Sequence, residues 1–124
     1  KKFSYVVVCI PPGENPGEYI KEVRYAATLL EEEGVLLLVS TTGVYGEKKE
    51  AVITEHSPIN ITSSRVKELV KSENFVLDIG GRVIRFAGLY SKDRGPHRVY
   101  LRTETSPRSP NIRRMFRNIR AWRN

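Results

Sequence analysis

Residues 35–46 read VLLLVSTTGVYG, and this stretch decides the fold class that we expect. The apolar run at 36–39 is typical of a strand covered on both faces, and such strands occur mainly in parallel sheets packed between helices. Ser40, Thr41 and Thr42 follow the run and would lie at its carboxyl end. Ligands of open α/β sheets bind at that edge, so this polar cluster indicates a site.

The residues before this stretch show a strand pattern and then a helix pattern. Residues 3–10 are rich in valine and end at Pro11 and Pro12, which predicts a strand followed by a loop. Apolar residues at spacings of three and four predict a helix over about 16–33, and Gly34 is placed to end it. This half of the chain therefore predicts a β-α-β unit with two parallel strands.

The residues after it predict one more helix and one more strand. Thr62 or Ser63 could cap a helix that runs to about Glu73 or a little beyond. The Gly-Gly pair at 80–81 breaks that pattern. Residues 82–87, RVIRFA, alternate charged and apolar side chains at first, which predicts a third strand. We therefore expect a β-α-β-α-β core.

Length and composition exclude several classes of protein. The 124 residues, 40% of them hydrophobic, are enough for one domain with a small core. The single cysteine, Cys9, rules out an intramolecular disulfide, and the two histidines, His56 and His97, are too far apart in sequence to predict a metal site. Because no apolar run approaches the roughly 20 residues that span a bilayer, we expect a soluble protein.

The positive charge lies at the end of the chain. Residues 1–101 carry a net charge of +1, whereas residues 102–124 hold seven arginines and one glutamate and carry +6. The Ser/Pro-rich run at 106–110 predicts a linker, and apolar residues at helical spacing between the arginines of 112–122 predict a basic amphipathic helix. Such a helix could bind RNA or an anionic membrane surface. Since no RNA-binding motif accompanies the charge, we favour a tail that packs loosely or is aberrant.

Three motifs in order resemble the extended short-chain dehydrogenase/reductase superfamily, also called the NAD-dependent epimerase/dehydratase family. VSTTGVYGE at 39–47 is similar to the family's strand-end motif, and the Thr-Ser-Ser run at 62–64 resembles the loop before its active-site helix. VIRFAGLY at 83–90 is similar to the strand that follows. The resemblance covers residues 3–105 and implies an α/β fold. Within it, we expect a partial Rossmann-like parallel sheet over 1–105, followed by a basic tail over 106–124.

The resemblance also implies a chemistry, namely hydride transfer between NAD or NADP and a small substrate such as a sugar nucleotide. Thr41 falls at the position of the family's catalytic hydroxyl, and Ser40 is a second candidate. The candidate cofactor contacts are Pro11, Pro12, Tyr45 and Gly88. On residue chemistry alone, Thr41 could equally satisfy backbone groups at a strand end, and Tyr45 could serve packing.

Two departures from the family argue against activity. Arg65 stands where the tyrosine of the Tyr-x-x-x-Lys pair belongs, and Leu69 stands where the lysine belongs. Arginine is no acid/base near neutral pH, although Arg65 could hold a phosphate or carboxylate, or be an ordinary exposed residue. No glycine-rich fingerprint precedes the first motif, and the strand at 3–10 corresponds to the family's fourth. We expect either an NAD(P)-dependent fragment or variant that is inactive as this chain alone, or a non-catalytic binding module with a basic tail.

The strand at 3–10 should also form an exposed edge, because in a complete family member another strand would pair with it. Its apolar residues, Val7 among them, are not interrupted by proline or by an inward charge that would block pairing. We therefore expect a marginal or self-associating domain. GLYSKDRGPH at 88–97 is similar to plant-type, organelle-associated members of the family, so the cytoplasm and the plastid both remain open as compartments.

Overall fold

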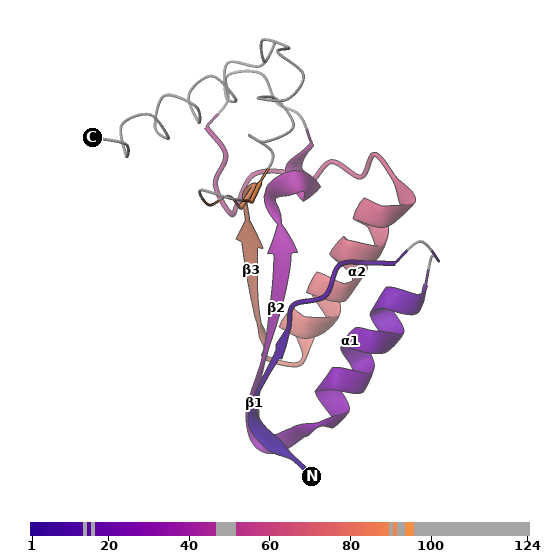
Figure 1. Ribbon diagram of the computed structural model, residues 1–124, viewed down its shortest axis with the longest axis vertical. Coiled ribbons are helices and arrows are strands. Elements are labelled where there is room, and N and C mark those ends of the chain that lie inside the picture. Colours follow the sequence, from indigo (N-terminus) through magenta and orange to yellow (C-terminus); the bar gives the residue numbers. More distant parts are fainter. Residues whose placement is uncertain (14, 16, 47–51, 90, 92–93, 96–124) are drawn as a thin grey trace, which may run out of the picture. The chain divides into compact units, whose positions relative to one another are not determined.

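The computed structural model describes residues 1–13, 15, 17–46, 52–89, 91 and 94–95. The predicted order of strands and helices is confirmed in Figure 1: β1 (Phe3–Val8), α1 (Glu18–Thr28), β2 (Leu30–Thr41), the 3-10 helix η1 (Thr42–Tyr45), α2 (Ser64–Asp78) and β3 (Arg82–Phe86). All of them belong to one compact unit, Lys1–Ala87, and the remainder of the chain forms a second unit. The predicted tail at 106–124 lies outside the described residues.

The three strands form one parallel sheet, as the sequence predicts, and their order in it is β1-β2-β3. Leu38 of the central strand pairs with Val8 on one side and with Val83 on the other. Within the described part of the chain, β1 and β3 are thus the edges of the sheet. The expected edge position of β1 is confirmed, although the strand ends two residues earlier than predicted.

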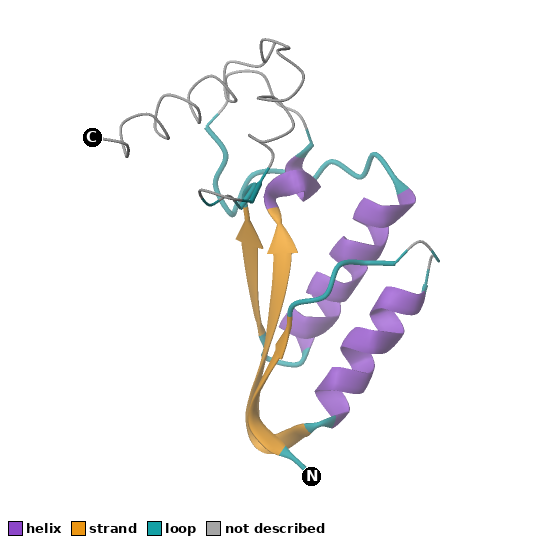
Figure 2. Cartoon of the chain, viewed as in Figure 1, coloured by secondary structure: helices purple, strands orange, loops and turns teal. Residues whose placement is uncertain are grey.

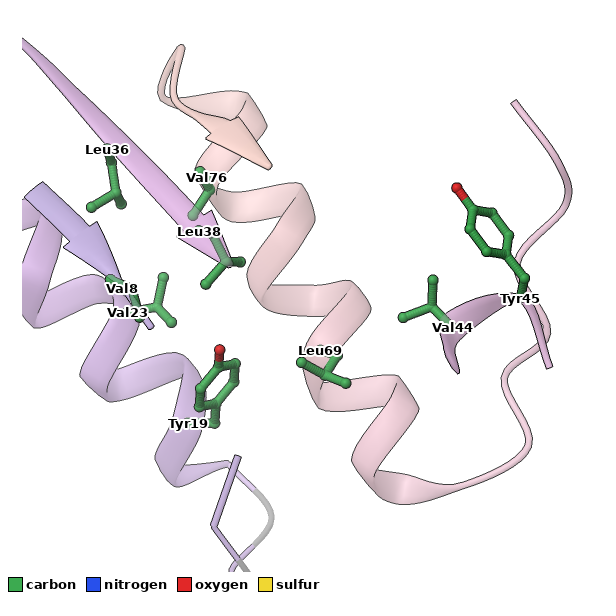
Figure 3. Packing of buried hydrophobic residues seen from close by; sticks show 9 residues of the cluster. All are labelled: Val8, Tyr19, Val23, Leu36, Leu38, Val44, Tyr45, Leu69 and Val76. Carbon is green, nitrogen blue, oxygen red and sulfur yellow. The ribbon is translucent and has the colours of Figure 1, made fainter. Parts of the chain in front are cut away.

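Both helices lie on one face of this sheet (Figure 2). Val23 of α1 and Val76 of α2 are fully buried, and they pack in the same cluster as Leu36 and Leu38 of β2 (Figure 3). The whole buried cluster comprises Val8, Tyr19, Val23, Leu36, Leu38, Val44, Tyr45, Leu69 and Val76. We expected a strand at 36–39 covered on both faces, but the described helices cover only one.

The boundary between α1 and β2 differs from the predicted one. The helix ends at Thr28 instead of about residue 33, and β2 already begins at Leu30. Three successive glutamates at 31–33 would oppose the dipole at a helix C-terminus, whereas in a strand they reach solvent. Gly34 therefore does not end the helix. It lies beside the irregular start of the β1–β2 ladder, where a Cβ atom would come within 3.0 Å of the Phe3 carbonyl oxygen.

The start of α2 agrees with the sequence pattern. Ser63, one of the two cap residues considered, is the N-cap, and its Oγ accepts a hydrogen bond from the backbone N–H of Val66 at 3.2 Å. The helix continues to Asp78, five residues past Glu73. The break at the glycine pair is confirmed, because α2 ends before it and β3 begins after it. A Cβ atom on Gly81 would lie 2.7 Å from the Leu36 carbonyl oxygen. Because Gly81 has no side chain, the chain between α2 and β3 can pass close to the backbone of β2.

Candidate functional site

The carboxyl ends of β1 and β2 lie at the same edge of the sheet. Val8 is the last residue of β1 and pairs with Leu38, three residues before β2 ends at Thr41. Because the strands are parallel, Pro11 and Pro12 leave the sheet at the edge where Thr41 ends β2. The two parallel strands predicted from the sequence imply that these residues share one sheet edge, and the structure agrees.

Thr41 is exposed and caps η1. Its Oγ1 accepts a hydrogen bond from the backbone N–H of Gly43 at 3.1 Å, and its own backbone is extended. The structure therefore shows the alternative role considered for Thr41, in which its hydroxyl group accepts a hydrogen bond from the backbone at the strand end. The hydroxyl proton is not used by that bond, so Thr41 could still donate it to a ligand.

Ser40 does not point to the same side of the sheet as Thr41. Successive strand residues face opposite sides, and Ser40 lies on the buried helix-facing side while Thr41 is exposed. The Ser40 Oγ has no hydrogen-bond partner among the described residues. The two hydroxyls therefore cannot serve one ligand together, and Thr41 is the more accessible of the two.

Tyr45 is a packing residue in this fold. It is buried, and its hydroxyl accepts a hydrogen bond of 2.6 Å from Nη1 of Arg85, whose guanidinium carbon lies 5.0 Å from the centre of the tyrosine ring. Gly46, which follows it, has a φ of 69°, and a Cβ atom there would lie 2.7 Å from Nδ2 of Asn60. The Val-Tyr-Gly part of the motif therefore holds the loop after η1 in place, through the contacts of Tyr45 with Arg85 and of Gly46 with Asn60.

Arg85 joins Tyr45 to a buried carboxylate. Its Nε donates to both carboxylate oxygens of Glu73, at 3.0 and 3.2 Å, and its Nη2 donates to Oε2 at 2.6 Å. The hydrogen bonds from Arg85 to Glu73 raise the pKa of Arg85 above its ordinary value, and the bond to Tyr45 adds to the shift. Arg85 and Glu73 are not among the site residues that the sequence predicts. The only available signal was a charged residue alternating with apolar ones in RVIRFA.

A small hollow lies between the loop after β1 and the first turns of both helices. Its volume is about 40 Å³, and it is lined by Pro12, Gly13, Asn15, Tyr19, Ser64, Arg65 and Glu68. Sites for drug-sized ligands have volumes of about 300–1,000 Å³, so this hollow suits a water molecule or one small polar group. It does not accommodate a dinucleotide. Pro12 is the predicted cofactor contact that lines it.

Polar atoms without partners surround the hollow. The Tyr19 hydroxyl and Oε2 of Glu68 are buried and form no hydrogen bond within the described residues. Burial, followed by the proximity of Cys9 and Glu73, raises the pKa of Tyr19 above its ordinary value. Arg65 is exposed and brings a positive charge to the rim. The hollow can therefore both donate and accept hydrogen bonds.

The two positions that would carry the family's Tyr-Lys pair have different surroundings. Arg65 is exposed in the first turn of α2, whereas Leu69 is buried in the core between the two helices. Gly88 belongs to the second unit, Gly88–Asn124. Among the residues that the structure describes, no group of three or more His, Cys, Asp or Glu side chains could hold a metal ion.

Comparison of this chain with protein-family models, with curated proteins and with solved structures finds no match. The resemblance to the epimerase/dehydratase family therefore remains a prediction that depends on the three motifs. The described residues contain no helix long and apolar enough to cross a membrane.

Proposed function

We propose that this chain is the nicotinamide-side part of an NAD(P)-binding α/β unit of the epimerase/dehydratase type, and that it is inactive as an oxidoreductase by itself. The supporting observation is that Thr41 and the Pro11–Pro12 loop share the carboxyl edge of a parallel sheet. This is the edge at which open α/β sheets bind ligands. The proposal further relies on the three motifs of the sequence.

The geometry of Thr41 suits a supporting contact better than a complete catalytic site. Its hydroxyl is exposed and retains a proton to donate, so it could hydrogen-bond a ligand oxygen. Proton transfer needs a second group of suitable pKa, and Leu69, buried in the core, cannot provide one. Arg65, exposed at the rim of the hollow, could bind an anionic group but does not titrate near neutral pH. We therefore expect the chain to bind the cofactor but not to catalyse hydride transfer.

Binding of the cofactor can be tested by thermal denaturation with NAD and NADP added separately. A ligand at about 100 times its dissociation constant stabilises the native state by about 2.7 kcal/mol, which raises the melting temperature measurably. We expect one of the two nucleotides to stabilise the chain and Thr41→Val to reduce the shift. Thr28→Val is a matched control, because Thr28 also makes one local hydrogen bond, 2.7 Å to the Tyr25 carbonyl, but at the end of α1.

Turnover is assayed separately, by following oxidation or reduction of the cofactor in the presence of sugar nucleotides. We expect none. Activity that Thr41→Val abolishes would show that the missing Tyr-Lys pair is replaced by other groups. If neither nucleotide shifts the melting temperature, the cofactor proposal is wrong for this chain.

A further inference from the structure

The 3-10 helix η1 sets the direction of the Thr41 hydroxyl. Thr41 Oγ1 accepts a hydrogen bond from the Gly43 N–H, which belongs to η1. This helix has only four residues, and a bond of 3.1 Å from the Gly46 N–H to the Gly43 carbonyl closes its end. Short 3-10 segments have poor hydrogen-bond geometry of their own. The groups that hold η1 in place therefore also fix Thr41.

Residues distant in sequence hold η1 against the rest of the fold. Its Val44 and Tyr45 side chains belong to the buried cluster (Figure 3). The Val44 carbonyl accepts a hydrogen bond of 2.9 Å from the Asn60 N–H. The Tyr45 hydroxyl accepts one of 2.6 Å from Nη1 of Arg85, in β3. Because a charged group donates this last bond, it is of the strong, short kind.

Glu73 fixes the orientation of the Arg85 guanidinium. Nε and Nη2 of Arg85 make three hydrogen bonds of 2.6–3.2 Å to the Glu73 carboxylate, while Nη1 donates to Tyr45. The Glu73 side chain is 1% exposed, so water competes little for these bonds. The guanidinium is planar, and a carboxylate that binds one side of it determines where Nη1 points. The ion pair thus connects α2 and β3 to η1.

We propose that Arg85 is a positioning residue, which directs the exposed hydroxyl of Thr41 toward a ligand at the carboxyl edge of the sheet by holding Tyr45. Binding sites are precise when hydrogen bonds to supporting residues lock their side chains. The statement about a ligand rests on the proposed function, in which Thr41 contacts the cofactor. The effect of Arg85 on the conformation of Thr41 does not rest on it.

A merely structural role for Arg85 predicts a different result. Loss of a buried contact lowers the stability of the whole unit and speeds the exchange of many amide protons together. Loss of positioning acts on the Gly43 amide, which donates to Thr41 Oγ1. The Val66 amide makes the same kind of bond, 3.2 Å to Ser63 Oγ at the start of α2. The ratio of the Gly43 and Val66 exchange rates therefore separates the two roles.

The experiment is amide hydrogen exchange followed by NMR on the 124-residue chain and on Tyr45→Phe, which removes the hydroxyl but keeps the buried ring. We expect the Gly43 rate to rise at least tenfold relative to the Val66 rate. Arg85→Lys keeps the charge but loses the planar fork, so it should have the same effect. The two substitutions together should add nothing further, because each breaks the same bond. If Arg85→Lys does not fold, Tyr45→Phe alone decides, since it leaves the ion pair intact.

The matched control is Tyr19→Phe, at another tyrosine that is 3% exposed. The Tyr19 hydroxyl has no hydrogen-bond partner among the described residues, so its removal should leave the ratio unchanged. A ratio that Tyr45→Phe also leaves unchanged overturns the proposal.

Thermal denaturation with NAD and NADP gives the second readout. Tyr45→Phe should reduce the nucleotide-induced rise in melting temperature as far as Thr41→Val does, and the double variant should reduce it no further. A rise that Thr41→Val reduces but Tyr45→Phe leaves intact overturns the proposal. If neither nucleotide stabilises the chain while the Gly43 exchange responds as expected, the cofactor proposal is wrong and the positioning of Thr41 by Arg85 is supported.

Discussion

The two faces of the sheet have nearly the same composition but opposite surroundings. Leu36 and Leu38 are fully buried beneath the helices, whereas Leu37 and Val39, their neighbours in β2, are only partly buried on the opposite face, called the outer face below. The contrast arises because both connections between the strands place their helices on one side of the sheet (Figure 2). The apolar residues of either face could form a core. The connections between the strands place both helices on one face, and that face became the core.

The strongest test of this contrast compares two leucines that are adjacent in β2. We expect Leu38→Ala to lower the free energy of unfolding by about 3 kcal/mol, because it leaves a cavity in the core. Leu37→Ala should cost about 1 kcal/mol or less, since solvent already reaches that side chain. Urea denaturation measures both. Equal losses would show that the outer face is covered as completely as the inner one.

The second test concerns the polar part of the helix-covered face. Glu73→Ala leaves Arg85 without its carboxylate partner. Breaking a buried ion pair costs about 3–5 kcal/mol, but the Arg85 side chain retains 19% exposure, so we expect a loss of about 2 kcal/mol. Glu22→Ala, on an exposed part of α1, is the control for removal of a glutamate from a helix. A loss no larger than that of the control would mean that the ion pair does not stabilise the fold.

The smallest expected effect is that of Tyr19→Phe, and it depends on pH. At about pH 8 we expect a change within about 1 kcal/mol, because the substitution removes a hydroxyl without a hydrogen-bond partner among the described residues. Burial raises the pKa of Tyr19 above its ordinary value of 10.0, so the unfolded chain releases this proton at lower pH than the folded one. Native stability should therefore fall as pH rises above 10.

The substitution should remove that pH-dependent loss. Urea denaturation at about pH 8 and about pH 10.5 gives the comparison, and we expect Tyr19→Phe to gain stability relative to the native chain at the higher pH. Tyr25→Phe, at an exposed tyrosine of the same helix, is the control. An identical pH dependence for the native chain and Tyr19→Phe would contradict a raised pKa for Tyr19.

The sequence predicted part of the candidate site. Parallel strands inferred from apolar runs correctly placed Thr41 and the Pro11–Pro12 loop at one edge. The alternation of side chains along β2 could have shown that Ser40 and Thr41 point to opposite faces of the sheet. The family resemblance instead made both hydroxyl groups candidates for one site. Packing was one of the roles expected for Tyr45, but its hydrogen-bond partner Arg85, forty residues further along the chain, needed the structure.

The sequence by itself determined the order of the strands and the two α-helices, a start of α2 at Thr62 or Ser63, and the glycine break before β3, because these features depend on neighbouring residues. It did not determine where α1 gives way to β2. Tertiary structure decided that boundary. Leu30 pairs with Phe3 of β1, and the glutamates that follow Leu30 therefore continue β2 instead of the helix. Tertiary structure also decided which face of the sheet became the core. Leucine and valine suit either face equally well, and only the path of the helices distinguishes the two.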